Sequence, residues 1–376
     1  SELALVMEEA AALGVKPGDR VAVQAEKSVE ALFLQLGIVR AGAALLPLNT
    51  AYTAKELDYF IADAEPAVFV CDPSLAQTLA PIAKAHGVAA LETLGADGTG
   101  SLTDKARAAS PDFRDVAREE TDLAAILYTS GTTGRSKGAM ITHGNLASNS
   151  AALVEAWRFT KDDALLHALP IFHTHGLFTA TNTLLRAGGS MIFLPKFDAG
   201  EVISLLPRAT TMMGVPTFYS RLLAREDFTA DLVSHIRLFV SGSAPLSAET
   251  HKAFSARTGK AILERYGMTE TNMITSNPYE GERRPGTVGL PLPGVEVQIA
   301  DDAGNALPQG EIGMIETRGP HVCRGYWRNE EKTRAEFREN GFFVTGDLGL
   351  IEPDGYVRIV GRGKDLIITG GLNVYP

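Results

Sequence analysis

The sequence is poor in cysteine and in basic residues. Cys71 and Cys323 are the only cysteines among 376 residues, too few for a disulfide framework or a four-thiolate metal site. This usage is compatible with a reducing compartment, so we expect a cytoplasmic protein. The 45 acidic residues outnumber the 35 basic ones, which gives a formal net charge of −10. Because no general positive field attracts phosphate backbones or anionic lipid, we expect no nucleic-acid and no membrane partner.

A long uninterrupted apolar run is also missing. The most apolar early stretch, residues 31–48, contains Gln35, Arg40 and Pro47 and falls short of the ~20 apolar residues of a spanning helix. The chain is nevertheless 45% hydrophobic, enough for sizeable cores, and its length suggests about two or three domains. It starts at Ser1 without a Met and ends abruptly after a Gly-rich turn, so we expect a piece of a longer protein. We expect a monomer.

The arrangement of hydrophobic runs predicts an α/β fold. From Asp19 to about Ile274, short β-rich runs alternate with helix-length amphipathic stretches such as Asn145–Trp157, a pattern typical of parallel sheets wrapped by helices. After about Pro278, short strands separated by Gly, Pro and Asp turns predict a small antiparallel β unit. The predicted strands cover residues 21–25, 67–71, 123–128, 164–169, 190–194, 211–215, 238–241, 261–264, 295–299, 313–317, 342–345 and 356–360.

One glycine- and hydroxyl-rich stretch stands out, from Tyr128 to Gly138. It follows a predicted strand, its glycines allow backbone N–H groups to turn inward, and Lys137 adds a positive charge; together these features suit a polyphosphate. The order G-x-x-x-x-G-K of a Walker A loop is not met, so a P-loop kinase or GTPase is disfavoured.

This stretch resembles the phosphate-binding signature of the adenylate-forming superfamily, which includes acyl-CoA synthetases. Four further matches follow in the family's order. They are Ser241–Pro245 (adenine pocket), Arg265–Glu270 (the tyrosine-glycine-x-threonine-glutamate motif), Thr345–Asp347 (ribose aspartate) and Gly361–Asp365 (hinge). The resemblance therefore covers almost the whole chain. It implies a large body of α/β subdomains at residues 1–276, a small β-rich subdomain at 277–361, and a hinge at 362–376 that starts a further domain.

The resemblance also implies a set of ATP-binding residues. Tyr266 offers a flat face to a purine, and the Asp347 carboxylate can accept hydrogen bonds from two ribose hydroxyls. Thr129 and Glu270 can hold Mg²⁺ through oxygen ligands, and we expect them to be the catalytic pair. The ATP set comprises Thr129, Ser130, Gly131, Thr132, Thr133, Gly134, Lys137, Ser241, Gly242, Ser243, Ala244, Pro245, Glu264, Arg265, Tyr266, Gly267, Met268, Thr269, Asp347 and Arg362.

The acid substrate is expected to lie near a histidine pair. His173 and His175 follow a predicted strand, and a metal role is disfavoured because no Cys cluster or third His stands nearby. We assign His175 to the substrate side, together with Ser241 and Met273, and a structural role to His173.

The segment from Thr271 to Gly289 bears on specificity. A dicarboxylate needs a cation for its second charge, ideally an arginine fork, and Arg283 or Arg284 could supply it. The segment resembles malonyl-CoA synthetases, in which an arginine aligned here with Arg283 is implied to hold the distal carboxylate. We therefore expect malonate, or methylmalonate, as substrate. Alternatives are another short or aromatic carboxylate, or a non-catalytic nucleotide-binding fragment.

The implied reaction uses ATP, Mg²⁺ and coenzyme A. Malonate attacks the α-phosphorus of ATP to form malonyl-adenylate and pyrophosphate, and the thiol of coenzyme A then displaces AMP. The family's C-terminal domain carries a lysine for the first step and swings about the hinge, here Lys364. Because the sequence stops shortly after this residue, we expect the 376-residue chain alone to make little malonyl-CoA.

Overall fold

The computed structural model describes residues 15–108, 114–129, 136–363, 367–369 and 372–374. The chain divides into two compact units, one formed by residues 1–144, 170–173 and 323–329, the other by residues 145–169, 174–322 and 330–376. The predicted N-terminal helix, the loop residues Ser130 to Gly134 and the hinge residue Lys364 lie outside the described residues. These two units divide the chain differently from the expected domain ranges, and those ranges stay predictions.

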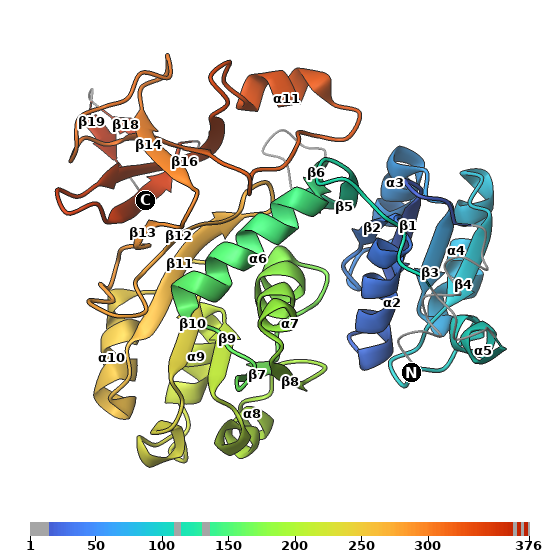
Figure 1. Ribbon diagram of the computed structural model, residues 1–376, viewed down its shortest axis with the longest axis horizontal. Helices are drawn as coiled ribbons and strands as arrows, with labels where there is room; N and C mark the ends of the chain where they lie inside the picture. Colours follow the sequence, from blue (N-terminus) through green and yellow to red (C-terminus); the bar gives the residue numbers. More distant parts are fainter. Residues whose placement is uncertain (1–14, 109–113, 130–135, 364–366, 370–371, 375–376) are drawn as a thin grey trace. The chain divides into compact units, whose positions relative to one another are not determined.

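The first unit is built on one six-stranded sheet with the order β4-β3-β1-β2-β5-β6. All neighbours are parallel except β5 and β6. Strands β1 to β3 are almost wholly buried, as expected for parallel strands covered on both faces. Helix α2 packs against β2, and α3 against α4 (Figure 1). The elements are β1 (Arg20–Gln24), α2 (Val29–Arg40), β2 (Ala44–Pro47), α3 (Ala54–Ala64), β3 (Val68–Cys71), η1 (Pro73–Leu75), α4 (Ala76–Ala85), β4 (Ala90–Thr93), α5 (Ser101–Ala108), β5 (Leu123–Thr129) and β6 (Lys137–Thr142).

The second unit contains a seven-stranded sheet with the order β13-β12-β11-β10-β9-β7-β8. Strands β7 to β11 are parallel, and β12 turns back against β11. Its core centres on Tyr219, Phe239 and Phe254, where α9 and α10 pack together. The elements are α6 (His143–Trp157), β7 (Ala164–His167), η2 (His175–Asn182), α7 (Thr183–Ala187), β8 (Ser190–Phe193), α8 (Ala199–Leu205), η3 (Leu206–Arg208), β9 (Thr211–Gly214), α9 (Pro216–Leu223), η4 (Asp231–Val233), β10 (Leu238–Ser241), α10 (Ala248–Thr258), β11 (Ile262–Met268), β12 (Asn272–Ser276) and β13 (Leu290–Pro291).

A small antiparallel sheet, β14-β15-β16-β17, completes the second unit. It agrees with the β unit predicted after Pro278. Its elements are β14 (Glu296–Ala300), β15 (Gly313–Arg318), β16 (Phe343–Ile351) and β17 (Val357–Arg362), with α11 (Glu330–Glu336) between β15 and β16; the hairpin of β18 (Ile367–Thr369) and β19 (Leu372–Val374) follows.

The predicted α/β class is confirmed, and every predicted strand has an observed counterpart. Strands β2 and β4 are among those that were not predicted: β2 follows a helix within one apolar stretch, and β4 has only one fully buried residue. The segment from Thr271, interpreted as a specificity loop, instead begins with the buried strand β12. Within the described part of the chain, no helix combines the length and apolarity needed to cross a bilayer.

Candidate active site

The site candidates of the second unit gather at the carboxyl edge of its parallel strands. The connection leaving β7 leads to β8 on one side, whereas the connection leaving β9 leads to β10 on the other. Ligands of open α/β sheets bind outside the carboxyl ends of strands at such a switch point. His175 begins η2, a π-helix after β7, and Ser241 ends β10. The fold therefore brings these two predicted substrate residues to the same edge.

A buried arginine lies at this edge. Arg265 is 3% exposed, and its guanidinium lies so close to Gly242 that a Cβ there would be 2.3 Å from Arg265 Cζ. Gly242 is therefore required for the arginine to occupy this position. Nη2 of Arg265 lies 3.5 Å from Ser243 Oγ, at the limit of a hydrogen bond, and Ser243 Oγ lies 3.2 Å from His175 Nδ1. The three side chains form a connected polar group.

The Arg265 guanidinium is poorly satisfied. Its Nε is buried and has no hydrogen-bond acceptor among the described residues. Burial lowers the pKa of Arg265 to about 9, although the nearby Tyr219 and Glu264 favour the charged form. A buried cation with open donors is costly unless an anion compensates it. The arrangement is therefore suited to binding a carboxylate or phosphate oxygen.

Ser241 in β10 and Glu264 in β11 are register partners on neighbouring strands. Ser241 Oγ and Glu264 Oε2 are both buried without a hydrogen-bond partner in the described part of the chain. Glu264 Oε1 accepts a 3.0 Å hydrogen bond from the backbone N–H of Leu246, and burial raises the pKa of Glu264 to about 7. This hydrogen bond ties the Glu264 side chain to the segment that follows Pro245.

The nucleotide candidates from β11, β16 and β17 form a second connected group. The Tyr266 hydroxyl donates a 2.6 Å hydrogen bond to Asp347 Oδ2, and Arg362 Nε lies 3.2 Å from Asp347 Oδ1. Asp347 and Arg362 are register partners in β16 and β17. A carboxylate has about four lone-pair sites, so about two remain for other donors. This geometry is compatible with the predicted binding of two ribose hydroxyls.

The turn between β11 and β12 carries the remaining motif residues. Gly267 is required there because a Cβ would lie 2.0 Å from the Asn272 carbonyl oxygen. Met268 and Thr269 are half-buried, and Glu270 is 4% exposed. Met273 packs into the hydrophobic core, so the structure gives this predicted substrate residue a packing role.

The two residues expected to hold Mg²⁺ lie one in each unit, and each carries oxygen donors. Glu270 supplies carboxylate oxygens and Thr129 a hydroxyl, which are ligands that this hard ion accepts. Among the described residues, no three His, Cys, Asp or Glu side chains come together as a metal cluster. Mg²⁺ usually keeps several waters and binds few protein ligands plus substrate phosphates, so each of the two residues is chemically suitable as a ligand.

The phosphate-loop candidates lie in the first unit. Thr129 ends β5 and pairs with Lys137 at the start of β6, so the loop joins two antiparallel strands. A Walker A loop leads from a strand into a helix, and this connection therefore agrees with its exclusion. Tyr59 donates a 2.9 Å hydrogen bond to the Ser136 carbonyl, and Lys137 Nζ lies 4.6 Å from the centre of the Tyr326 ring.

The expected carboxylate clamp, Arg283, is engaged elsewhere. Its guanidinium donates hydrogen bonds to the backbone carbonyls of Ala261, Pro278 and Tyr279, at 2.8, 3.3 and 3.0 Å. Ala261 precedes β11, at the opposite end of the strand from the site residues. These contacts engage the Arg283 guanidinium in the fold, and its expected role as the carboxylate clamp stays a prediction.

Arg284, the second candidate for the distal carboxylate, is also engaged by other side chains. It forms ion pairs with Glu282, Glu352 and Asp354, and its guanidinium lies 4.0 Å from the centre of the Tyr356 ring. These contacts join the segment after β12 to the turn between β16 and β17. Arg284 is therefore no free cation for a substrate.

The sequence reasoning missed the second possible role of Arg265, which it counted only among the nucleotide residues. A signal was present: the arginine directly follows the strand predicted at residues 261–264, and a cation that becomes buried there rarely stays without a partner.

Comparison with known proteins shows the family of the chain. The family model described as AMP-binding enzyme matches residues 3–327. The chain is 36% identical to the mitochondrial malonate–CoA ligase of Mus musculus over 99% of this chain and 70% of that protein. It is 35% identical to a feruloyl-CoA synthase of an Amycolatopsis species over 97% of this chain and 72% of that protein.

Solved structures give the same assignment of fold. The ATP-bound crystal structure of MatB from Rhodopseudomonas palustris superposes with a TM-score of 0.98 and 62% sequence identity. The match covers all of this chain and 75% of that one, so the relative is the longer of the two.

Proposed function

This chain belongs to the AMP-binding enzyme family, and from that premise we propose that it is the large body of an ATP-dependent malonate–CoA ligase. The reaction joins malonate and coenzyme A with cleavage of ATP to AMP and pyrophosphate. In its first step, a malonate carboxylate oxygen forms a bond to the α-phosphorus and pyrophosphate leaves. In the second, the sulfur of coenzyme A forms a bond to the acyl carbon, AMP leaves, and the thiol proton passes to solvent.

The observation that carries the choice of malonate is the buried, incompletely paired guanidinium of Arg265. A monocarboxylate substrate loses its charge when its single carboxylate becomes the adenylate. Malonate keeps a second carboxylate that must be compensated in a site shielded from water. Arg265 provides fork-like donors next to Ser243 and His175, which suits a planar carboxylate.

The residues of this chain contribute mainly by binding and orienting. We propose that Asp347 and Tyr266 fix the ribose and purine, and that the hydroxyls and Lys137 of the phosphate loop hold the phosphates. When bound, Mg²⁺ would neutralise phosphate charge, with Thr129 and Glu270 as its ligands. Holding the acid and the α-phosphate in a reactive geometry is the main catalytic contribution.

We make three further proposals, on the use of coenzyme A, on the compartment and on the oligomeric state. The ligase relatives act with coenzyme A, which supports it as the second substrate here. We propose a cytoplasmic monomer; both cysteines are free and buried, which supports a reducing compartment.

The test compares three acids on the same chain by ATP–pyrophosphate exchange, with isothermal titration calorimetry of each acid as a second measurement. We expect malonate to support exchange and to bind more tightly than propionate, which lacks the second carboxylate, and than ferulate. Faster exchange with ferulate would assign the chain to the aromatic acids. Tighter binding of propionate than of malonate in calorimetry would overturn the dicarboxylate assignment even if exchange were slow with every acid.

A further inference from the structure

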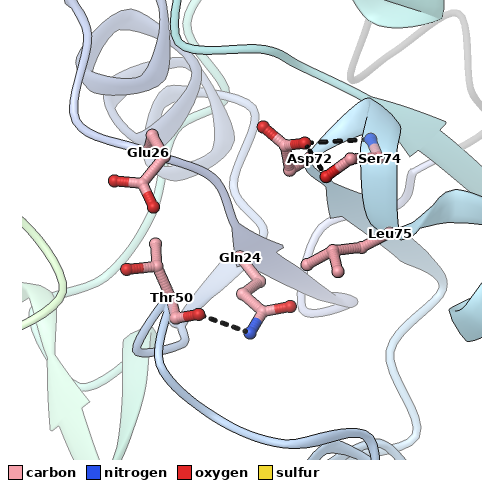
Figure 2. Close-up of a pocket in the computed structure, with 6 residues that line it drawn as sticks. All are labelled: Gln24, Glu26, Thr50, Asp72, Ser74 and Leu75. Atoms are coloured by element: carbon pink, nitrogen blue, oxygen red, sulfur yellow. Dashed lines mark hydrogen bonds between the residues drawn. The ribbon is translucent and has the colours of Figure 1, made fainter.

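A polar pocket of the first unit contains none of the predicted site residues. It has a volume of about 230 Å³ and is lined by Gln24, Glu26, Thr50, Asp72, Ser74 and Leu75 (Figure 2). Asp72 Oδ1 accepts hydrogen bonds from the Ser74 backbone N–H and hydroxyl at 2.9 and 2.6 Å, so this carboxylate is engaged within the pocket wall. We assign no ligand to this pocket. The π-helix η2 of the second unit offers a more informative arrangement.

Two buried side chains donate to one backbone carbonyl of η2, that of Gly176. His167 Nε2 and Thr181 Oγ1 each lie 2.9 Å from this oxygen. Because a carbonyl oxygen only accepts, His167 Nε2 carries a proton and donates. His167 ends β7, and its ring lies 5.2 Å from the ring of Phe193 in β8, between ring centres. Since His167 and Thr181 are 1% and 0% exposed, both hydrogen bonds are shielded from water.

The Thr181 hydrogen bond is specific to the π-helical register. In a π-helix the carbonyl of residue i is one turn away from residue i+5, and Thr181 stands five positions after Gly176. In an α-helix a threonine hydroxyl reaches the carbonyl four positions back, which here belongs to Leu177. The observed bond therefore stabilises the π-helical form of this segment. Such π-helical turns are frequent at functional sites.

The register of η2 determines where the His175 side chain lies. His175 directly precedes Gly176 and begins η2. Its Nδ1 lies 3.2 Å from Ser243 Oγ, which in turn lies 3.5 Å from Arg265 Nη2. A change of one residue in register would rotate His175 relative to Thr181 by about 100° around the helix axis. The histidine would then leave this polar group.

We propose that His167 and Thr181 are positioning residues that hold η2 in its π-helical form and thereby keep the His175 ring beside Ser243. They act through the Gly176 carbonyl, one from the end of a buried strand and the other from within the helix. The consequence for malonate, which is expected to bind at Arg265, rests on the proposed function. The position of His175 in the fold does not.

The first test compares two threonines of η2 in the 376-residue chain. Thr181→Val removes the donating hydroxyl with almost no change of shape. Thr179→Val is the matched control, because Thr179 is 1% exposed in the same helix and its hydroxyl has no hydrogen-bond partner among the described residues. With ¹³C at histidine Cε1, NMR resolves the His175 signal, which is identified by its loss in His175→Gln. We expect Thr181→Val to shift this signal and Thr179→Val to leave it in place.

The second test measures malonate affinity by calorimetry. Thr181→Val and His167→Leu should each weaken malonate binding about three- to tenfold, because one hydrogen bond that positions the histidine is lost. His167→Gln should recover part of the loss, since its amide N–H can donate to the same carbonyl. Thr179→Val should bind malonate as the wild type does.

The two measurements separate this role from the proposed function. An unmoved His175 signal in Thr181→Val and His167→Leu would overturn the proposal, and so would an equal shift in Thr179→Val. A His167→Gln variant no better than His167→Leu would exclude His167 as the donor that matters. If the His175 signal shifts as expected but the wild type does not bind malonate, the proposed function fails and the positioning role stands.

Discussion

Tyr266 and Asp347 are joined by a 2.6 Å hydrogen bond in which the phenol donates to the carboxylate, although 81 residues separate them in the chain. Both side chains are buried, and burial together with the Asp347 charge holds the pKa of Tyr266 well above its usual range. The phenol therefore stays protonated and remains a donor at any ordinary pH. The bond fixes the orientation of the Asp347 carboxylate before a nucleotide binds.

This relationship predicts that Asp347→Ala and Tyr266→Phe both weaken ATP binding, by different amounts. Asp347→Ala should cost on the order of 1.5–3 kcal/mol, because charge-assisted hydrogen bonds to the ribose are lost. Tyr266→Phe should cost about 0.5–1.5 kcal/mol, because the carboxylate remains but is less well oriented. Calorimetric titration with ATP measures both values.

Tyr356→Phe is the control for this pair. The Tyr356 hydroxyl also donates to a partner in the second unit, the Glu282 carbonyl at 2.8 Å, but it takes no part in the predicted nucleotide group. Its loss should lower stability slightly and leave ATP affinity unchanged. Wild-type ATP affinity in Asp347→Ala would remove Asp347 from the site.

The buried Arg265 predicts a selective effect on the dicarboxylate. Arg265→Met should weaken malonate binding by roughly 30-fold or more and leave propionate nearly unchanged, because only malonate presents the second charge. Arg265→Lys should recover a part, since a point charge replaces a planar fork. Stability should stay equal or rise in Arg265→Met, because replacing an incompletely paired buried cation with an apolar side chain removes a desolvation cost.

Arg283→Met separates this role from a general effect of losing an arginine. Three backbone carbonyls lose their donor in that variant, so its free energy of unfolding should fall by about 2 kcal/mol or more. The ratio of malonate to propionate affinity should remain that of the wild type. A change of this ratio in Arg283→Met, with none in Arg265→Met, would restore Arg283 as the clamp.

The sequence supported the α/β class, most strands and the family, because those signals are local. The different surroundings of Arg265 and Arg283 show where local signals end. The shortest hydrogen bond of Arg283 goes to the carbonyl of Ala261, 22 positions away in the chain, and only the folded structure brings the two together. Burial of Arg265 against Gly242 likewise depends on the register of two strands. The roles expected of the site residues, Arg265 and Arg283 included, stay predictions.

We expect the removal of the Tyr59 hydroxyl to weaken nucleotide binding through the phosphate loop. Its hydrogen bond to the Ser136 carbonyl fixes the end of the loop, and Tyr59→Phe removes it. We expect ATP affinity to fall about three- to tenfold and AMP affinity to change less, because AMP lacks the β- and γ-phosphates that the loop is expected to hold. Tyr52→Phe is the control, since Tyr52 packs against the same Phe60. Equal losses for ATP and AMP would contradict the assignment of this loop to the phosphates.

Glu264 predicts a pH dependence of stability. Burial raises its pKa from 4.5 in the unfolded chain to about 7 in the folded protein. The folded state therefore binds the proton more tightly than the unfolded state does. The contribution of Glu264 to the free energy of unfolding is fully present below about pH 4.5 and is lost as the pH rises through about 7. The total change is up to about 3 kcal/mol.

Glu264→Gln isolates this contribution. The amide keeps an oxygen that can accept the hydrogen bond from the Leu246 N–H, and it carries no charge to desolvate at high pH. Urea unfolding of both proteins between pH 5 and pH 8 should show the wild type losing stability relative to the variant as the pH rises, with the difference levelling off above about pH 7. A difference that does not change with pH would show that Glu264 has the same pKa in the folded and unfolded chains. A difference of opposite sign would mean that the carboxylate is stabilised on folding, with the charge of Arg265 outweighing the effect of burial.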